Sequence, residues 1–238
     1  RPFHLLEPAD PDFASGNLLC EVGPIAARLL LLPGDPFDDR VEFDDTNVEW
    51  WKEDRPDPAT GRKTDWGGAL LVSADGLVRG QRPKASAPWE RCLVLRRSGA
   101  VEMVLSVQEA RFDFGQGPRL ALIKVVGRVV AAMAEFGAAI QRFDVSGPWE
   151  LSLALCNAKG SRLGHVAQRF KENVAVFPGE FCTQDAIVIR KELAEWPSGD
   201  DLLKLAFDVG GRIENAWGTL GRRFLDADGN LDVSEYGW

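Results

Sequence analysis

The stretch that decides the fold is residues 119–157, RLALIKVVGRVVAAMAEFGAAIQRFDVSGPWELSLALCN. Its first part repeats apolar residues at spacings of three and four, which places them on one stripe of a helix. These residues are Leu120, Ile123, Val126, Val130, Met133, Ala134 and Phe136. After a turn at residues 145–148, apolar and polar residues alternate from Trp149 onward, which is typical of a strand with one buried face. We therefore expect a helix at about 119–140 that packs on a sheet.

A second amphipathic helix is predicted at about 199–217. Its apolar positions are Leu202, Leu205, Val209, Ile213, Ala216 and Trp217. We expect Ser198 to be the N-cap, because a hydroxyl just before a periodic apolar segment accepts a hydrogen bond from the first helical turn. Gly210 and Gly211 lower the helix propensity in the middle of this segment, so we expect a kink or a close helix contact there.

Strand patterns lie on both sides of the first helix. We expect strands at residues 25–32, 47–51, 149–156, 174–177 and 186–193. Two hairpins are predicted at residues 69–79 and 89–107, around the turns SADG and RSGA. Because consecutive hairpins build an antiparallel sheet, we predict an α+β fold with a largely antiparallel or mixed sheet. The two principal helices, at about 119–140 and 199–217, pack against it.

The domain organisation follows from composition and length. Residues 1–24 are rich in Pro, Asp and Gly and show no sustained period, so we interpret them as an irregular lead-in. We expect residues 25–238 to form a single α+β domain, and a subdivision near 110–118 stays open. No run of about 18 apolar residues occurs, so we predict no membrane span.

The negative charge of the chain is concentrated in one segment. Residues 35–57 contain ten acids and three basic residues, a local charge of −7 within a total of −8. Nucleic-acid binding depends on phosphate neutralisation by Lys and Arg, so this balance argues against it. That hypothesis needs one group of basic residues to converge on a single face of the sheet. The group is Arg79, Arg82, Lys84, Arg91, Arg96 and Arg97.

We expect no metal and no cofactor. The four cysteines, Cys20, Cys92, Cys156 and Cys182, are far apart and form no C-x-x-C motif, so we interpret them as reduced residues of a cytoplasmic protein. Residues 224–235 align in part with a calcium loop, but a phenylalanine stands at the first ligand position. Residues 61–64, GRKT, lack the glycine that precedes the lysine of a phosphate-binding loop.

One alternative is an enzyme. His165 is the best candidate for a general base, because histidine titrates near neutral pH. It has no acid or nucleophile close to it in sequence, so its partners must come from elsewhere in the fold. The hypothesis is a hydrolase that uses His165 with a carboxylate, and it requires the histidine to lie in a cleft beside an acid.

The preferred candidate site is an interaction surface around the acidic segment. Trp50 and Trp51 are adjacent, so on a strand they point to opposite faces and only one of them can join the core. We expect acids to surround the other tryptophan and to select a basic or cationic surface, on a protein partner or on a second copy. The predicted interaction residues are Trp50, Trp51, Trp66, Asp44, Asp45 and Glu49.

Two stretches carry a resemblance to a known family. They are residues 147–155, GPWELSLAL, followed by residues 159–164, KGSRLG, and the late segment AWG at 216–218 before FLDADGN at 224–230. Together they resemble the region that follows the Alba-type DNA-binding domain of bacterial Schlafen-like proteins. The resemblance implies a C-terminal accessory domain of a larger cytoplasmic bacterial protein, one that senses, oligomerises or recruits. It assigns no functional residue. We therefore expect a non-enzymatic domain for protein interaction, oligomerisation or ligand sensing, with the hydrolase and a nucleic-acid-associated regulatory domain as alternatives.

Overall fold

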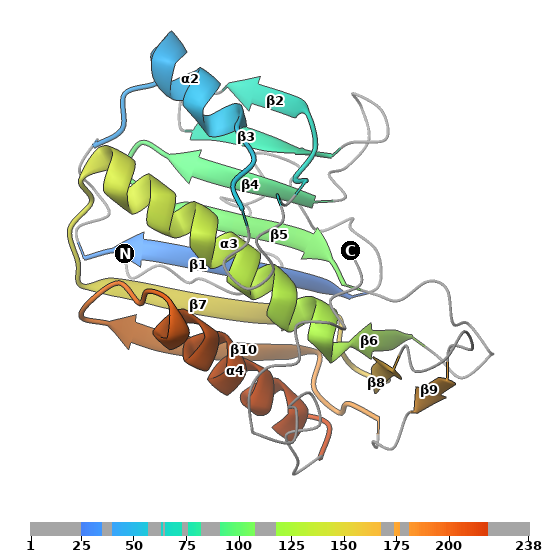
Figure 1. The fold of residues 1–238 in the computed structure, drawn as a ribbon. Helices are drawn as coiled ribbons and strands as arrows, with labels where there is room; N and C mark the ends of the chain where they lie inside the picture. The colour runs from blue at the N-terminus through green and yellow to red at the C-terminus, as the bar shows by residue number, and fades with distance from the viewer. Residues whose placement is uncertain are drawn as a thin grey trace.

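The computed structural model describes residues 25–34, 40–56, 63, 65–72, 76–81, 91–107, 118–167, 174–176 and 181–218. Within these residues a seven-stranded sheet carries three helices on one face (Figure 1). The strand order is β10-β7-β1-β5-β4-β3-β2, and every neighbouring pair is antiparallel. The predicted α+β class with a largely antiparallel sheet is therefore confirmed.

The bounds of these elements agree with most of the predicted segments. The strands of the large sheet are β1 (Ala26–Pro33), β2 (Ala69–Val72), β3 (Gly76–Gln81), β4 (Arg91–Arg96), β5 (Val101–Ser106), β7 (Trp149–Cys156) and β10 (Ala186–Leu193). The helices are α2 (Asp45–Lys52), α3 (Leu122–Phe143) and α4 (Asp200–Asn215). Both predicted hairpins are confirmed, as β2 pairs with β3 and β4 pairs with β5.

A second, three-stranded sheet adjoins the start of α3. It consists of β6 (Arg119–Ala121), β8 (Arg162–Ala167) and β9 (Val174–Val176). β6 pairs with β8 in parallel, and β8 pairs with β9 antiparallel. The predicted start of the long helix is therefore wrong by three residues, because residues 119–121 hydrogen-bond to another strand before the helix begins.

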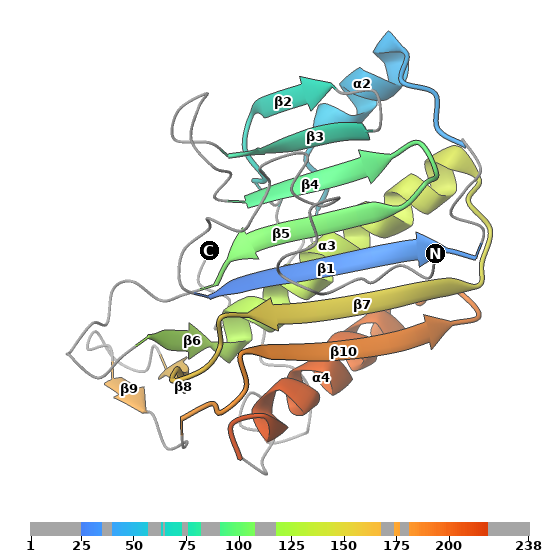
Figure 2. The ribbon, with the colours of Figure 1, turned by 180° about the vertical axis from the view of Figure 1, so that it is seen from behind.

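β1 lies in the interior of the large sheet, between β7 and β5, where Leu29 pairs with Met103 on β5 and with Leu153 on β7. Strand side chains alternate between faces, and Leu29 and Leu31 join the main apolar cluster shared with the helices. Leu30 and Leu32 belong to a separate cluster on the other face, the one turned toward the viewer in Figure 2. The main cluster contains buried residues from β1 through α4, so these elements share one core.

The structure contradicts the predicted strand at residues 47–51, because they lie in helix α2. The side chain of Asp44 caps this helix by accepting a hydrogen bond from the backbone N–H of Asn47, at 2.7 Å. Lys52 lies in the last turn, where a cation interacts favourably with the helix dipole. Capping and charge placement therefore prevail here over the β propensity of two adjacent tryptophans.

The N-cap predicted for the second principal helix is also wrong. Gly199, not Ser198, occupies the N-cap position of α4, and no side chain caps the helix. Ser198 contributes its carbonyl oxygen instead, which accepts a hydrogen bond from the N–H of Asp201 at 3.1 Å. The helix runs without interruption through Gly210 and Gly211. Shortly after it ends, Trp217 is buried and donates its Nε1–H to the carbonyl of Ser161 at 2.9 Å.

Candidate functional site

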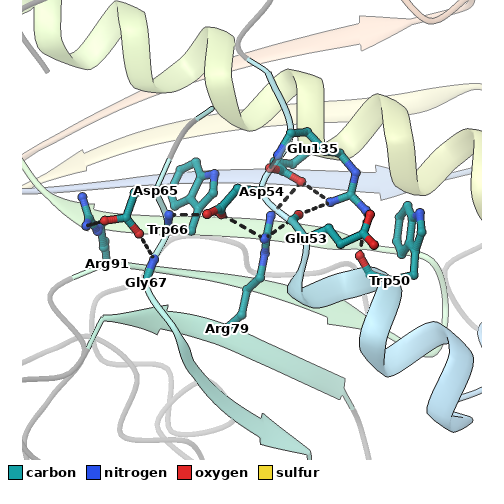
Figure 3. A network of polar contacts seen from close by, with 10 residues as sticks. Trp50, Glu53, Asp54, Asp65, Trp66, Gly67, Arg79, Arg91 and Glu135 are labelled. Atoms are coloured by element: carbon teal, nitrogen blue, oxygen red, sulfur yellow. Dashed lines mark hydrogen bonds and ion pairs between the residues drawn. The ribbon is translucent and has the colours of Figure 1, made fainter. Parts of the chain in front are cut away.

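A buried ion pair joins the sheet to the long helix. Arg79 extends from the same face of β3 as the core residue Leu77, and its Nη2 lies 2.7 Å from Oε2 of Glu135 on α3 (Figure 3). The side chains of Arg79 and Glu135 are only 2% and 1% exposed. Burying one unpaired charge is strongly unfavourable, so each of these side chains depends on the other.

The segment after α2 completes this network. Arg55 Nη1 lies 2.6 Å from the same Glu135 oxygen, Oε2. Arg79 Nη1 donates a hydrogen bond to the carbonyl of Glu53 at 2.8 Å and lies 3.3 Å from Oδ1 of Asp54. That Asp54 oxygen also accepts the backbone N–H of Trp66 at 3.4 Å. We call Arg55, Arg79, Glu135 and Asp54 the ion-pair network; it contains two cations and two anions.

The electrostatics of the network suit a structural anchor. Burial lowers the pKa of Arg79. The negative charges of Glu135 and Asp54 oppose this shift, and the neighbouring Arg55 cation adds to it. An arginine nonetheless keeps its charge in a protein, so Arg79 remains a buried cation that needs its anionic partner. Its geometry instead holds residues 53–55 against both β3 and α3.

Helix α2 is fixed to α3 by further contacts. The guanidinium of Arg55 lies 3.9 Å from the centre of the Trp50 ring and also donates to the Trp50 carbonyl at 3.0 Å. The Trp50 ring packs edge-on against Phe143, with ring centres 5.4 Å apart. Arg142, one residue before Phe143, donates two hydrogen bonds to Oδ1 of Asn47, at 3.1 and 3.2 Å. α2 is therefore anchored along its inner side.

The structure does not bring the three predicted tryptophans together as an exposed patch. Trp51 and Trp66 are 0% exposed and belong to the main core. Trp50 is half-buried, and Arg55 covers its ring. The adjacent tryptophans do differ in burial as predicted, but the reason is helical rotation and not strand alternation. In this conformation Trp51 and Trp66 are inaccessible to a partner.

The three predicted acids lie together on α2 and at its N-cap, and all are exposed. Asp44 caps the helix, Asp45 begins it, and Glu49 lies one turn further on and forms an ion pair with Lys52. Two more exposed acids, Glu42 and Glu53, flank the helix. We call Glu42, Asp44, Asp45, Glu49 and Glu53 the α2 acidic surface. Their part in an interaction stays a prediction.

The basic residues named for nucleic-acid binding do not converge where the structure describes them. Arg79 is buried beneath the helices. Arg96 lies on the opposite face of the sheet, where its Nη2 is 3.5 Å from Oε2 of the buried Glu102. Arg82 and Lys84 lie outside the described residues. Among the described arginines, the single basic face that this hypothesis needs is therefore not formed.

The hydrolase hypothesis is not tested by the structure. His165 lies in β8 and pairs with Val176 on β9, but its side chain is not among those described. In the described part of the chain, no group of three or more His, Cys, Asp or Glu side chains is arranged to hold a metal ion. The calcium-loop segment at 224–235 and the residues Gly61, Arg62 and Thr64 of the GRKT motif lie outside the described residues.

The described cysteines, Cys92, Cys156 and Cys182, carry reduced thiols, and Cys20 lies outside the described residues. Burial is the main reason that the pKa of Cys92 is raised, and the negative charge of Glu102 adds to the shift. Burial also raises the pKa of Cys182, and a backbone hydrogen bond with Gln184 offsets part of this shift. Both shifts disfavour the thiolate, so neither thiol is activated as a nucleophile.

Sequence reasoning missed the ion-pair network, although a signal was present. Arg79 interrupts the apolar strand LVRG, and Glu135 interrupts the apolar helix segment AMAEFG. The same pattern marks Arg28 and Glu102, whose side chains are joined on the other face of the sheet by hydrogen bonds of 2.7 and 3.1 Å. A lone charge inside a predicted buried element needs a partner of opposite charge. The sequence therefore marks these four residues as charges that need a partner, but charge alone does not say which arginine joins which glutamate.

Within the described ranges, no helix is long and apolar enough to cross a membrane.

Comparisons with known proteins assign no family to the chain. No protein-family model matches the sequence, and neither the curated proteins nor the solved structures include a significant match to it.

Proposed function

We propose that this chain is a non-catalytic accessory domain of a larger bacterial cytoplasmic protein, and that it binds a basic protein surface through the α2 acidic surface. The observation that carries the proposal is the contrast between the two sides of α2. Its inner side is held by the buried Trp51 and the ion-pair network, while Asp45 and Glu49 face solvent. The resemblance to the region after the DNA-binding domain of Schlafen-like proteins is consistent with an accessory role.

Two physical arguments support this choice. A helix already fixed in place loses little conformational freedom when a partner binds, so less interaction energy is needed for ordering. Exposed acids on such a helix attract a basic partner and repel nucleic-acid phosphates. The charged groups of the ion-pair network already bond to each other and to backbone carbonyls, so they stabilise the fold and leave the exposed acids for recognition.

The test is a charge reversal with a matched control in another helix. Asp45 lies in the first turn of α2, and Glu49 forms an ion pair with Lys52, three residues further along. Asp200 and Asp201 occupy the first turn of α4, and Asp201 likewise pairs with Lys204. Asp45→Lys/Glu49→Lys and Asp200→Lys/Asp201→Lys therefore change the net charge equally and disturb similar local contacts.

The probe is a fluorescein-labelled oligolysine peptide, and its binding is measured by anisotropy at several salt concentrations. We expect the α2 variant to bind about tenfold more weakly, and the α4 variant to lose less than about twofold. A labelled DNA duplex is expected not to bind. Equal losses in the two variants would show that only net charge matters, and the proposal would then be wrong.

A further inference from the structure

The two edges of the large sheet differ in chemistry. β10 forms one edge and contains Arg190, Lys191 and Glu192, charges of the kind that protect an edge strand from pairing with another chain. β2 forms the other edge, and its four residues, ALLV, include no charge and no proline. An edge strand presents unpaired N–H and C=O groups along its outer side. Among the described residues, β2 therefore lacks the charges that protect β10 and has no proline in their place.

Two of the four side chains of β2 are also exposed. Leu71 and Val72 are 45% and 53% exposed, although their partners across the strand pair, Val78 and Leu77, are buried. Leu70, two residues before Val72, packs against the main core beneath the helices. Ala69, two residues before Leu71, packs against the cluster on the other face. Leu71 and Val72 therefore lie on opposite faces of the sheet, and one further strand beside β2 would shield both.

Helix α2 lies at this edge. Figures 1 and 2 both place it beside the C-terminal end of β2, in the same layer as the other helices. The ion-pair network fixes that position, because Arg79 of β3 bonds to Glu53 and Asp54 directly after α2. A strand added to β2 would thus have the α2 acidic surface near one of its faces and the apolar side chain of Leu71 at the other.

We propose that the β2 edge binds an extended segment of a partner protein as an eighth strand, and that apolar and basic residues alternate in this segment. The apolar residues would cover Leu71, and the basic residues would lay their aliphatic stems over Val72 and extend their charges toward Asp45 and Glu49. The inference rests on the proposed function, for which it supplies the mode of binding and the partner's pattern. Backbone hydrogen bonds provide affinity in this mode, and the alternating side chains provide specificity.

The experiment uses the intact chain and a short labelled peptide in which valine and lysine alternate. One control peptide has the same composition in two blocks, and a second carries N-methyl groups along one edge, which removes the N–H donors without changing the charge. The protein variants are Leu71→Thr/Val72→Thr and Val188→Thr. Threonine adds no charge and has a high strand propensity, so both variants should keep their strands. Val188 is the matched control, because it is 43% exposed on the opposite edge strand.

We expect the alternating peptide to bind and to slow hydrogen exchange at the amides of residues 69–72. The β2 variant and the N-methylated peptide should each weaken binding about tenfold, and Val188→Thr should change it less than about twofold. The block peptide should bind about tenfold more weakly than the alternating one.

Three results would overturn the proposal, and they separate it from the proposed function. If the N-methylated peptide binds equally well and Asp45→Lys/Glu49→Lys still weakens binding, strand addition is wrong and the α2 surface alone binds the peptide. If neither the β2 variant nor the α2 variant matters, both proposals are wrong. If sedimentation of the protein alone shows an association that Leu71→Thr/Val72→Thr abolishes, the occupant of the edge is a second copy and not a partner segment.

Discussion

Nη2 of Arg79 on β3 lies 2.7 Å from Oε2 of Glu135 on α3, and both side chains are almost completely buried. The same Glu135 oxygen also forms an ion pair with Arg55, which belongs to the segment after α2. One carboxylate thereby joins the sheet, the long helix and the helix that carries the exposed acids. The stability of this corner of the molecule should depend on that carboxylate.

Glu135→Gln should destabilise the protein by about 3–5 kcal/mol. Glutamine keeps the shape of the side chain but removes the negative charge that compensates the buried Arg79. The measurement is urea denaturation followed by circular dichroism. Glu49→Gln is the control, because Glu49 is exposed, and it should change the free energy of unfolding by less than about 0.5 kcal/mol. A loss below about 1 kcal/mol for Glu135→Gln would contradict the assigned role.

Gly67→Ala should destabilise the protein by about 2 kcal/mol or more. Gly67 has φ +96°, and a Cβ there would lie 2.6 Å from the backbone C and O of Gly80, which cannot move aside as a side chain can. Gly68→Ala is the matched control, because a Cβ at Gly68 meets nothing within 4 Å. Denaturation midpoints of the two variants test this, and equal midpoints would show that residue 67 does not need glycine.

Gly137→Ala should destabilise the protein although alanine is the better helix former. A Cβ at this position of α3 would lie 2.7 Å from Nε1 of Trp196, so the indole and its packing against Trp149 must shift. The expected net loss is about 1 kcal/mol. Gly211→Ala in α4 meets nothing within 4 Å and should stabilise by about 0.5–1 kcal/mol. Thermal unfolding that shows the same sign for both variants would contradict the prediction.

Cys92 should react much more slowly than Cys156 in the folded protein. Burial and the nearby Glu102 raise the pKa of Cys92, so little thiolate forms at pH near 8, whereas Cys156 is only half-buried. The measurement is iodoacetamide labelling under native conditions, followed by mass spectrometry of the peptides. The expected rate ratio is about tenfold or more. In urea the two thiols should label at similar rates, and a fast reaction of Cys92 in the native protein would contradict its burial.

Cys92 should also make stability depend on pH. Above about pH 8.5, the ordinary thiol pKa, the unfolded chain loses this proton while the folded protein keeps it. The unfolded state then binds fewer protons, so the free energy of unfolding falls as the pH rises. Between about pH 9 and 10, where the unfolded thiol is largely but not fully ionised, Cys92→Ala should show a slope shallower by about 1 kcal/mol per pH unit. Urea denaturation at several pH values measures it, and parallel slopes would refute the prediction.

The periodic parts of the sequence determined most of the secondary structure. The long helix lies at residues 122–143, three residues later than predicted. Both hairpins and the alternating strand from Trp149 lie where the patterns predict them. Apolar spacing determines these elements locally, because a helix or strand forms only where its own residues place one continuous face toward the core. The order of the strands, in contrast, does not follow from any local pattern.

Only the tertiary structure decided the partners of the buried charges. For residues 45–52, capping by Asp44 is a local signal for a helix, and packing of Trp50 on Phe143 of α3 adds to it. Arg79 and Glu135 are each visible in the sequence as a charge in an apolar run, but their pairing depends on how α3 crosses the sheet. Such long-range pairs form because a buried charge is unfavourable without a neighbour of opposite charge, and only the complete fold determines which residue becomes that neighbour.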